Sequence, residues 1–568
     1  MRLAGRLLLA LPLASLALAG ATGAAPVPGG GKANNHAGFA TSQPSMLVAT
    51  VPGASVTPLI TVGETLPGGY LFEAIPDGVS LITRGQARVD VLVNHETSTV
   101  PFPYTHPGAP TEANQNDFVN AEVSELIFSR HSGRILHGSK LIRSNENYQR
   151  FCSNYLATEK EGFDRPILFT NEEAVEWVNR SGKAWPGTTG APESRQSGVV
   201  VAHDTRRNKT RPIWGMGRLN HENTVAIPGF DDLVMMTTDD TFQSLPPQSQ
   251  LYSYIAEDTD AVWGDEGDLW AFASDTPGFD DYFDFAPGST MSITGHFVKV
   301  PKDVATGRKP DGTDMVAADK GYPPPPASGW ARDARGVPVD GPQWILEHWG
   351  DTQPQPVFQF IRLEDLAYDK SNPNIVYLVD SGAGTTGDPQ QGRSTNGRVW
   401  RMVLDPADPT KVLSLSILIE GDDRPVKDPD RIHQPDNIES TANSLLIQED
   451  PGSSQQFNPG DANATTARIW RYTLVGGAMD VVARVDQSAD EGPTDVDAAP
   501  AGRLGAWESS GIVDASAAFG PGAFLVTIQA STLWVDKQLG DDNFPPPGAD
   551  FFYQREGGQL VLLRLPGT

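Results

Sequence analysis

Acidic side chains stand beside short apolar segments along this chain, in an arrangement that could bind cations. Glu222 precedes the apolar segment 224–227, and the next apolar segment, 233–237, ends in Asp239 and Asp240. Turn residues separate the two segments, so we expect two neighbouring strands with carboxylates at their shared edge. Carboxylate oxygens from separate loops suit Ca²⁺, which takes six to eight hard oxygen ligands in loose geometry.

The same order of residues recurs three more times. Glu364 precedes a strand IVYLV, Asp436 precedes a strand SLLIQ, and Glu508 precedes a strand AFLVTIQ. Counted from Glu222, these four leading acids stand 142, 72 and 72 residues apart. Because 142 is close to twice 72, the spacing predicts a repeat of roughly 70 residues with one copy altered beyond recognition.

A repeat of several short strands predicts an all-β fold, a β-propeller with long loop insertions. Each blade brings a loop to the same end of the central channel, so acids at equivalent positions should converge there. Ionised carboxylates repel one another unless cations neutralise them, which predicts bound calcium. The acids and the one amide at these positions are Glu96, Glu172, Glu173, Glu222, Asp239, Asp240, Glu364, Asp365, Asp436, Asn437 and Glu508.

Two histidines and one cysteine belong to the same stretches. His95 and His221 each stand in an NHE triplet, where a hydrogen-bonded structural role is the commoner outcome and metal binding the alternative. Cys152 is the single cysteine, which rules out an internal disulfide framework. Its side chain is either a small buried apolar group or a metal ligand.

The chain divides into a leader, an arm and one large domain. Residues 1–25 carry Arg2 and Arg6, an apolar stretch and small residues, as a secretory signal peptide does. Residues 26–60 are rich in Gly, Pro, Ser, Ala and Thr, which predicts a flexible arm. The remainder, 61–568, should form a single propeller, with 265–355 rich in insertions that are either a degenerate blade or long loops.

Charge and composition restrict the partners. Asp and Glu outnumber Lys and Arg by 71 to 43, giving a net charge of -28, which argues against nucleic acid or an anionic membrane as a partner. The apolar run of the leader is too short for a confident membrane span. We therefore expect a secreted or periplasmic protein with no membrane attachment after signal cleavage.

The usual hydrolase and nucleotide-binding signatures are missing from the sequence. It contains no G-x-S-x-G elbow, no P-loop and no H-E-x-x-H pair, so neither a serine nucleophile nor a phosphate-binding glycine loop is indicated.

Several motifs in a fixed order resemble the PhoX-type secreted alkaline phosphatases. They are the NHE triplet at Asn94, Cys152 followed by the pair Glu172 and Glu173, GRLNHE with TTDD, RLEDLAYDKSNPNIVYLVDSG from Arg362, and QPDNIE with a later QED. The chain departs from that family in the segment SNYLATEKEGFDRPILFTN after the cysteine, and its leader has no Arg-Arg pair.

The resemblance implies a six-bladed propeller with calcium and iron at the channel mouth. It implies that Cys152 is an iron (Fe³⁺) ligand, that Glu222 bridges metals, and that Glu172 or Glu173, Glu364 and Asp436 are further ligands. Glu222 and Cys152 would then carry the catalysis, and the substrate would be a small phosphomonoester. Two alternatives stay open. One is a calcium-stabilised propeller that binds a ligand or surface partner without catalysis, and the other is a calcium-dependent phytase-like hydrolase in which Cys152 plays no part.

Overall fold

The computed structural model describes a unit that begins at Gly38. The described residues are 38–96, 120–175, 177–179, 194–242, 246–327, 339–382, 396–423, 428–450, 465–487, 507–536 and 552–567. The predicted signal peptide, 1–25, lies outside them. None of the described helices is long and apolar enough to cross a membrane.

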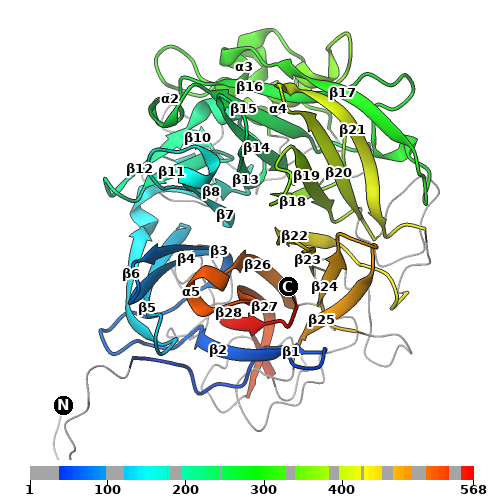
Figure 1. The fold of residues 1–568 in the computed structure, drawn as a ribbon. Helices are drawn as coiled ribbons and strands as arrows, with labels where there is room; N and C mark the ends of the chain where they lie inside the picture. The colour runs from blue at the N-terminus through cyan, green and yellow to red at the C-terminus, as the bar shows by residue number, and fades with distance from the viewer. Residues whose placement is uncertain are drawn as a thin grey trace, which may run out of the picture. The chain divides into compact units, whose positions relative to one another are not determined.

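Antiparallel strands make up most of this unit, in groups of four or five that follow one another along the chain (Figure 1). The first group is β3 (Ile75–Arg84), β4 (Arg88–Glu96), β5 (Glu122–Ser129) and β6 (Ile135–Ile142). The second is β7 (Phe151–Ala157), β8 (Ile167–Glu172), β11 (Val200–Asp204) and β12 (Lys209–Ile213), beside the small pair β9 (Trp177–Asn179) and β10 (Ser194–Gln196).

Two further groups share one sheet of nine strands. It contains β13 (His221–Ile227), β14 (Leu233–Asp239), β15 (Leu251–Ala256), β16 (Asp268–Ser274), β17 (Ser292–Lys299), β18 (Leu363–Tyr368), β19 (Ile375–Asp380), β20 (Arg398–Asp405) and β21 (Asp408–Glu420). The outer strands β17 and β21 pair with each other and join the two groups.

The last two groups take in strands from the start of the described chain. One contains β22 (Pro435–Ser440), β23 (Ser444–Glu449), β24 (Arg468–Thr473), β25 (Met479–Val485) and β1 (Leu47–Ala49). The other contains β26 (Trp507–Asp514), β27 (Ala523–Asp536), β28 (Phe552–Arg564) and β2 (Ser55–Thr61). The predicted flexible arm, 26–60, is therefore wrong for residues 38–60, because β1 and β2 complete two sheets as outer strands.

The inner strands of these groups pack against one another in a closed cycle. In order they are β3, β7, β13, β18, β22 and β26, and β26 returns to β3. Between the groups lie apolar clusters, such as the one that combines Leu378 and Trp400 with Val225. This arrangement confirms the all-β propeller. The predicted number of six separate blades is not confirmed, since two of the groups share the nine-stranded sheet.

Among the described residues, the interval between Glu222 and Glu364 does not contain the altered repeat that its length predicts. A single strand group begins at β13, and it is followed by an insertion with α3 (Lys302–Thr306) and α4 (Pro342–Asp351) before β18. Within the described residues, no second set of four paired strands lies in this interval. The long spacing therefore comes from the insertion. The other described helices are also short, α2 (Thr259–Gly264) and α5 (Ser516–Phe519).

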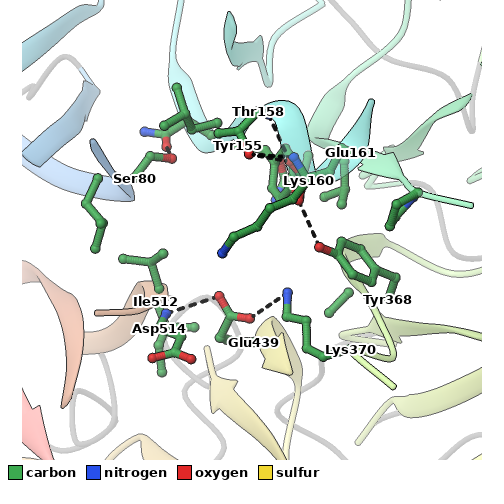
Figure 2. A pocket seen from close by; sticks show the side chains of 18 of the residues that line it. Ser80, Tyr155, Thr158, Lys160, Glu161, Tyr368, Lys370, Glu439, Ile512 and Asp514 are labelled. Atoms are coloured by element: carbon green, nitrogen blue, oxygen red, sulfur yellow. Dashed lines mark hydrogen bonds and ion pairs between the residues drawn. The ribbon is translucent and has the colours of Figure 1, made fainter. Parts of the chain in front are cut away.

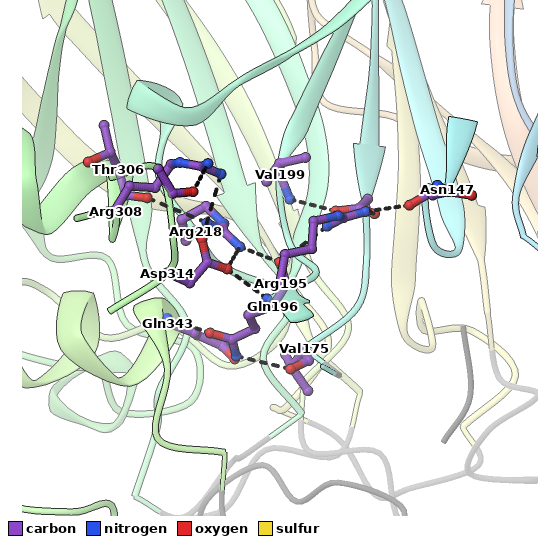
Figure 3. A network of polar contacts seen from close by, with 12 residues as sticks. Asn147, Val175, Arg195, Gln196, Val199, Arg218, Thr306, Arg308, Asp314 and Gln343 are labelled. Carbon is purple, nitrogen blue, oxygen red and sulfur yellow. Dashed lines mark hydrogen bonds and ion pairs between the residues drawn. The ribbon is translucent and has the colours of Figure 1, made fainter. Parts of the chain in front are cut away.

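Buried polar contacts attach the insertion to the second and third strand groups (Figure 3). Asp314 of the insertion accepts hydrogen bonds from Arg218 at 3.0 and 3.1 Å and from the backbone of Gln196 at 2.7 Å. The Arg218 side chain is fully buried. A buried guanidinium needs such a partner, since an unpaired buried charge is costly. The insertion is thus fixed to the sheets beneath it.

Candidate metal centre

A bulge at the same place in five inner strands positions the candidate site. In β3, Pro76 pairs with His95 and Val79 pairs with Val93, so three steps along β3 match two along β4. The same irregularity occurs at the start of β7, β13, β18 and β22. A bulge leaves one extra residue unpaired and turns its side chain away from the ladder. The first bulged residues are Asp77, Cys152, Glu222, Glu364 and Asp436.

A second set of acids lies at the ends of the partner strands. The residue just before each bulge pairs with a residue of the partner strand, and the acid is the next residue along that strand. The acids are Glu96, Glu173, Asp240 and Asp450. The sixth inner strand differs, because its bulge comes later and Glu508 pairs directly with Gln529. Both sets are thus brought to the same end of the inner strands.

All of these side chains except Asp77 line one cavity of about 440 Å³. Its carboxylates are Glu96, Glu173, Glu222, Asp240, Glu364, Asp436, Asp450 and Glu508, and Cys152 is its thiol. The convergence predicted from the sequence spacing is therefore present in the structure. Glu222 and Glu364 are each only 2% exposed, so this is a buried acidic site and not a solvated surface patch.

The potential ligand atoms form four groups whose members lie within 4.8 Å of one another. The groups are Asp77, Glu96 and Cys152; Cys152, Glu173 and Glu222; Glu222, Asp240 and Glu364; and Asp436, Asp450 and Glu508. Cys152 and Glu222 each belong to two groups, which links three of the four into one cluster. Such spacing is compatible with several cations that share ligands.

Burial raises the pKa of Glu173, Glu222 and Cys152 in the cavity. The pKa of Glu173 rises to about 8, chiefly by desolvation. Desolvation followed by the charge of Asp436 raises the pKa of Glu222 well above its usual range. The pKa of the Cys152 thiol is raised well above its usual range by burial and then by Asp77. Without cations, the anionic forms are thus costly here, and a set of buried anionic donors fits divalent or trivalent ions.

Two arginines at the cavity supply positive charge. Arg362 donates to both carboxylate oxygens of Asp240 at 3.0 and 3.1 Å and lies 3.2 Å from Glu364. Arg150 also lines the cavity. Both have left-handed backbone conformations, with φ of 50° and 35°. Such strain at a non-glycine residue is held by the surrounding structure and is characteristic of functional sites.

A polar layer lies under the cavity. Ser153 donates to Glu222 Oε1 at 2.8 Å and accepts from Asn437 Nδ2 at 3.0 Å. Ser153 and Asn437 are the second bulged residues of β7 and β22. Asn437, which the sequence suggested as a ligand, is thus turned to this layer, and Asp365 accepts from Asn223 and from the backbone of Ile438.

Two predicted ligands lie outside the cavity. Glu172 accepts from Arg195 at 2.5 and 2.8 Å, and Asp239 accepts from Thr241 at 2.9 Å. Successive residues of a strand point to opposite sides, so Glu173 and Asp240 face the cavity while their predecessors face away. For Glu172 and Asp239, the predicted place among the metal ligands at the channel mouth is wrong.

The two histidines have hydrogen-bonded structural positions. His95 bonds to the Glu73 carbonyl at 2.7 Å and to Ser124 at 2.5 Å. His221 bonds to Thr237 at 2.8 Å and to the Gly217 carbonyl at 3.3 Å. Both ring nitrogens of each are therefore engaged, as the commoner sequence interpretation expects.

Several members of the site were not predicted. Asp77, Asp450, Arg150, Arg362 and Gln529 belong to it. A comparison of PDGV, FCSN, HENT, LEDL and PDNI would have revealed Asp77 and the equivalent position of Cys152. Arg150, two residues before Cys152, and Arg362, two residues before Glu364, share a position as well.

The opposite end of the inner strands opens into a larger cavity of about 970 Å³ (Figure 2). Its charged groups are mostly paired: Lys370 lies 3.4 Å from Glu439, and Tyr368 donates to Glu161 at 2.9 Å. Among the described residues, no group of three potential metal ligands lies in this cavity. Chemistry that needs several cations is therefore better placed in the smaller, acidic cavity.

Fold and site together define a β-propeller with an acidic, cysteine-containing centre at one end of its channel. No protein-family model and no curated protein matches the chain. Among solved structures, one from a study of two prolyl endopeptidases aligns with 80% of this chain at 9% identity and a TM-score of 0.22, and the chain spans about half (54%) of its length. A Trypanosoma rangeli sialidase aligns with 91% of this chain and 96% of its own, at 9% identity and a TM-score of 0.20. At these TM-scores neither likeness bears on function.

Proposed function

We propose that the protein is a secreted, metal-dependent phosphatase that hydrolyses small phosphomonoesters at the acidic cavity. The observation that carries the proposal is the repeated bulge, which brings five potential metal ligands from five inner strands to the same end of the channel. A propeller held together by apolar packing alone would not need this arrangement, because burying carboxylates side by side is costly unless cations pair with them.

The donor set fits both calcium and iron. Carboxylate oxygens such as those of Glu364, Asp436 and Glu508 suit Ca²⁺, while the thiolate of Cys152, with Glu222 at 3.1 Å, suits a transition metal such as Fe³⁺. Such ions, when bound, supply polarisation of the phosphoryl oxygens and activation of water at neutral pH. Cys152 and Glu222, which belong to two ligand groups each, would hold the central ions.

The chain's own side chains would bind and orient the ester. Phosphoryl transfer depends mainly on positioning and on stabilising charge. Arg362 and Arg150 line the cavity, and a guanidinium matches two phosphate oxygens at once. Asp240 holds Arg362 in place through two hydrogen bonds. Phe242 is 58% exposed at the cavity, and Arg362 lies 5.1 Å from the centre of its ring, so its free face is available to the organic part of a substrate.

A phosphatase assay with an aryl phosphate, run on protein as purified, after chelation and after calcium is restored, tests this proposal. We expect hydrolysis that disappears on chelation and returns with metal. Bound calcium without any turnover would favour the non-catalytic, ligand-binding propeller. Turnover with calcium but no iron would favour the phytase-like hydrolase, in which Cys152 has no catalytic part.

A further inference from the structure

A second group of buried oxygen atoms lies away from the central cavity, between α4 and the strands β14 and β15. Gln343 and Glu347 are four residues apart on α4, so their side chains lie on the same face of the helix. They are only 4% and 5% exposed. Hydrogen bonds tie both side chains to the segment that follows β14, and Asp239 is the last residue of that strand.

Two short chains of hydrogen bonds bring these groups together. Gln343 Nε2 donates to Thr241 Oγ1 at 3.0 Å, and Thr241 donates to Asp239 Oδ1 at 2.9 Å. On the other side, Gln250 Nε2 donates to Glu347 Oε2, and the backbone of Gln250 bonds to the Asp239 carboxylate. Asp239 is thus linked through one residue to each of the two α4 side chains.

Three acceptor oxygens, on α4 and on the segment that leads into β15, have no hydrogen-bond partner. They are Gln248 Oε1, Gln343 Oε1 and Glu347 Oε1, all on residues at most 9% exposed. The neighbouring Gln250, in contrast, has hydrogen bonds at both ends of its amide. Its Nε2 also donates to Gln359 at 2.6 Å, and its Oε1 accepts from Tyr252 at 3.0 Å. Buried acceptors without donors are rare in proteins and call for an ion or a water molecule.

The chemistry of the unpaired atoms favours a cation. All three are oxygens that only accept, and nearby Asp239 adds a second carboxylate. Burial, together with the charges of Asp351 and Asp239, raises the pKa of Glu347 well above its usual range, so ionised Glu347 needs a positive partner. Water molecules can donate to such oxygens, but they leave the charge of ionised Glu347 uncompensated. A hard divalent ion accepts carboxylate and amide oxygens together.

We propose that Glu347, Gln343, Gln248 and Asp239 form a second, structural calcium site that fixes α4 to the propeller sheet. This site is separate from the central cavity and does not depend on phosphatase activity. It gives Asp239, which faces away from the channel, a role in cation binding. It also explains why a helix with a buried carboxylate packs against the ends of β14 and β15.

The test is the calcium content of full-length protein after gel filtration in buffer with a known free calcium concentration, for wild type, Glu347→Gln and Glu257→Gln. Glu257 is an exposed acid and provides the matched control substitution. We expect Glu347→Gln to lose one calcium ion per chain and Glu257→Gln to lose none. Unchanged stoichiometry in Glu347→Gln would overturn the proposal.

Thermal unfolding supplies a second measurement. The difference in melting temperature between Glu347→Gln and wild type should depend on whether calcium is present. With calcium, Glu347→Gln should melt several degrees below wild type, about the loss expected when a stabilising ligand is removed. In excess chelator it should melt at or above the wild-type temperature, because the substitution removes a buried carboxyl group that then has no cation to pair with. If Glu347→Gln is the more stable protein in both buffers, Glu347 is a neutral acid and the proposal fails.

If the variant does not fold, wild-type crystals decide the question. Anomalous scattering from crystals soaked in Mn²⁺ or Tb³⁺ should show a peak between α4 and β14. A peak only in the central cavity would overturn this site while leaving the proposed function intact. The reverse result, a peak at α4 alone, would leave this site standing and remove the basis of the proposed function.

Discussion

Cys152 and Glu222 occupy the same position in two neighbouring inner strands, and Cys152 Sγ lies 3.1 Å from Glu222 Oε1. Each is the first residue of a bulge at the start of its strand. The thiol also lies 2.8 Å from Asp77 Oδ2, on the first inner strand. Three successive strand groups therefore meet at the sulfur atom, which makes Cys152 the most informative residue to change.

Replacement of Cys152 should separate a metal ligand from a core residue. We expect Cys152→Ala to lose iron and visible absorption, and to reduce aryl phosphate hydrolysis by about 100-fold, the upper end of what loss of even an outer-shell partner of a metal costs. The fold should persist, with a cost in stability of roughly 1 kcal/mol for such a small side chain.

Cys152→Ser is the matched control, because it keeps the size of the side chain and replaces sulfur by oxygen. Partial retention of calcium with loss of iron would agree with a thiolate ligand. Full activity in both variants, with only a small fall in melting temperature, would show that Cys152 is a packing residue.

The adjacent acids Glu172 and Glu173 provide a paired test of strand register. Glu173→Gln should lower metal content and activity, since Glu173 faces the cavity. Glu172→Gln should leave metal content unchanged but cost up to about 3–5 kcal/mol of stability, because Arg195 would lose its buried carboxylate partner. Metal analysis and urea unfolding of both variants measure the two effects. Equal metal loss in both would contradict this register.

Metal-free protein should lose stability as the pH rises from about 6.5 to 8. The pKa of Glu173 in the folded chain is about 8, against 4.5 for the ordinary group. Folded protein therefore binds more protons than unfolded protein in this window, and stability falls with increasing pH. Below about 6.5, the buried histidines act in the opposite sense, because burial lowers the pKa of His221 and of His433 to about 3.

Saturating calcium should abolish this loss, since bound cations stabilise the ionised acids. Melting temperatures measured at several pH values, in chelator and in calcium, make the comparison. A metal-free protein whose melting temperature stays constant or rises between pH 6.5 and 8 would contradict the predicted charge state of the cavity.

Arg362 should matter more for stability in the absence of metal than in its presence. Arg362→Met leaves Asp240 buried without its partner, at a cost of about 3–5 kcal/mol. Cations bound nearby would pair with Asp240 and reduce that cost. Urea unfolding in chelator and in calcium gives the two values, and Arg362→Lys shows how much depends on the paired hydrogen bonds. Equal costs in both buffers would indicate that no cation reaches Asp240.

Most of the fold could be predicted from the sequence because acids recur at equivalent positions of the repeat. The spacing of Glu364, Asp436 and Glu508 follows three successive strand groups. It misled only where the insertion with α3 and α4 lengthened one interval to nearly two repeats. The predicted flexible arm is wrong for residues 38–60 because small polar residues favour coil locally, whereas pairing with strands from the far end of the chain decides their structure.

The site was harder to define because it depends on register. At the end of a strand, one step along the chain moves a side chain to the other face. Sequence alone therefore could not choose Glu173 over Glu172 or Asp240 over Asp239. The contribution of Asp77 depends on a bulge that places it beside Cys152, and the sequence shows this only when the starts of the inner strands are compared with one another.

Metal analysis of the wild-type protein, beside an aryl phosphate assay with and without chelator, tests the central claim most directly. The account predicts calcium and iron in the purified protein, and hydrolysis that chelation removes and added metal restores. A folded protein that contains neither metal, and takes up none when both are supplied, would contradict it.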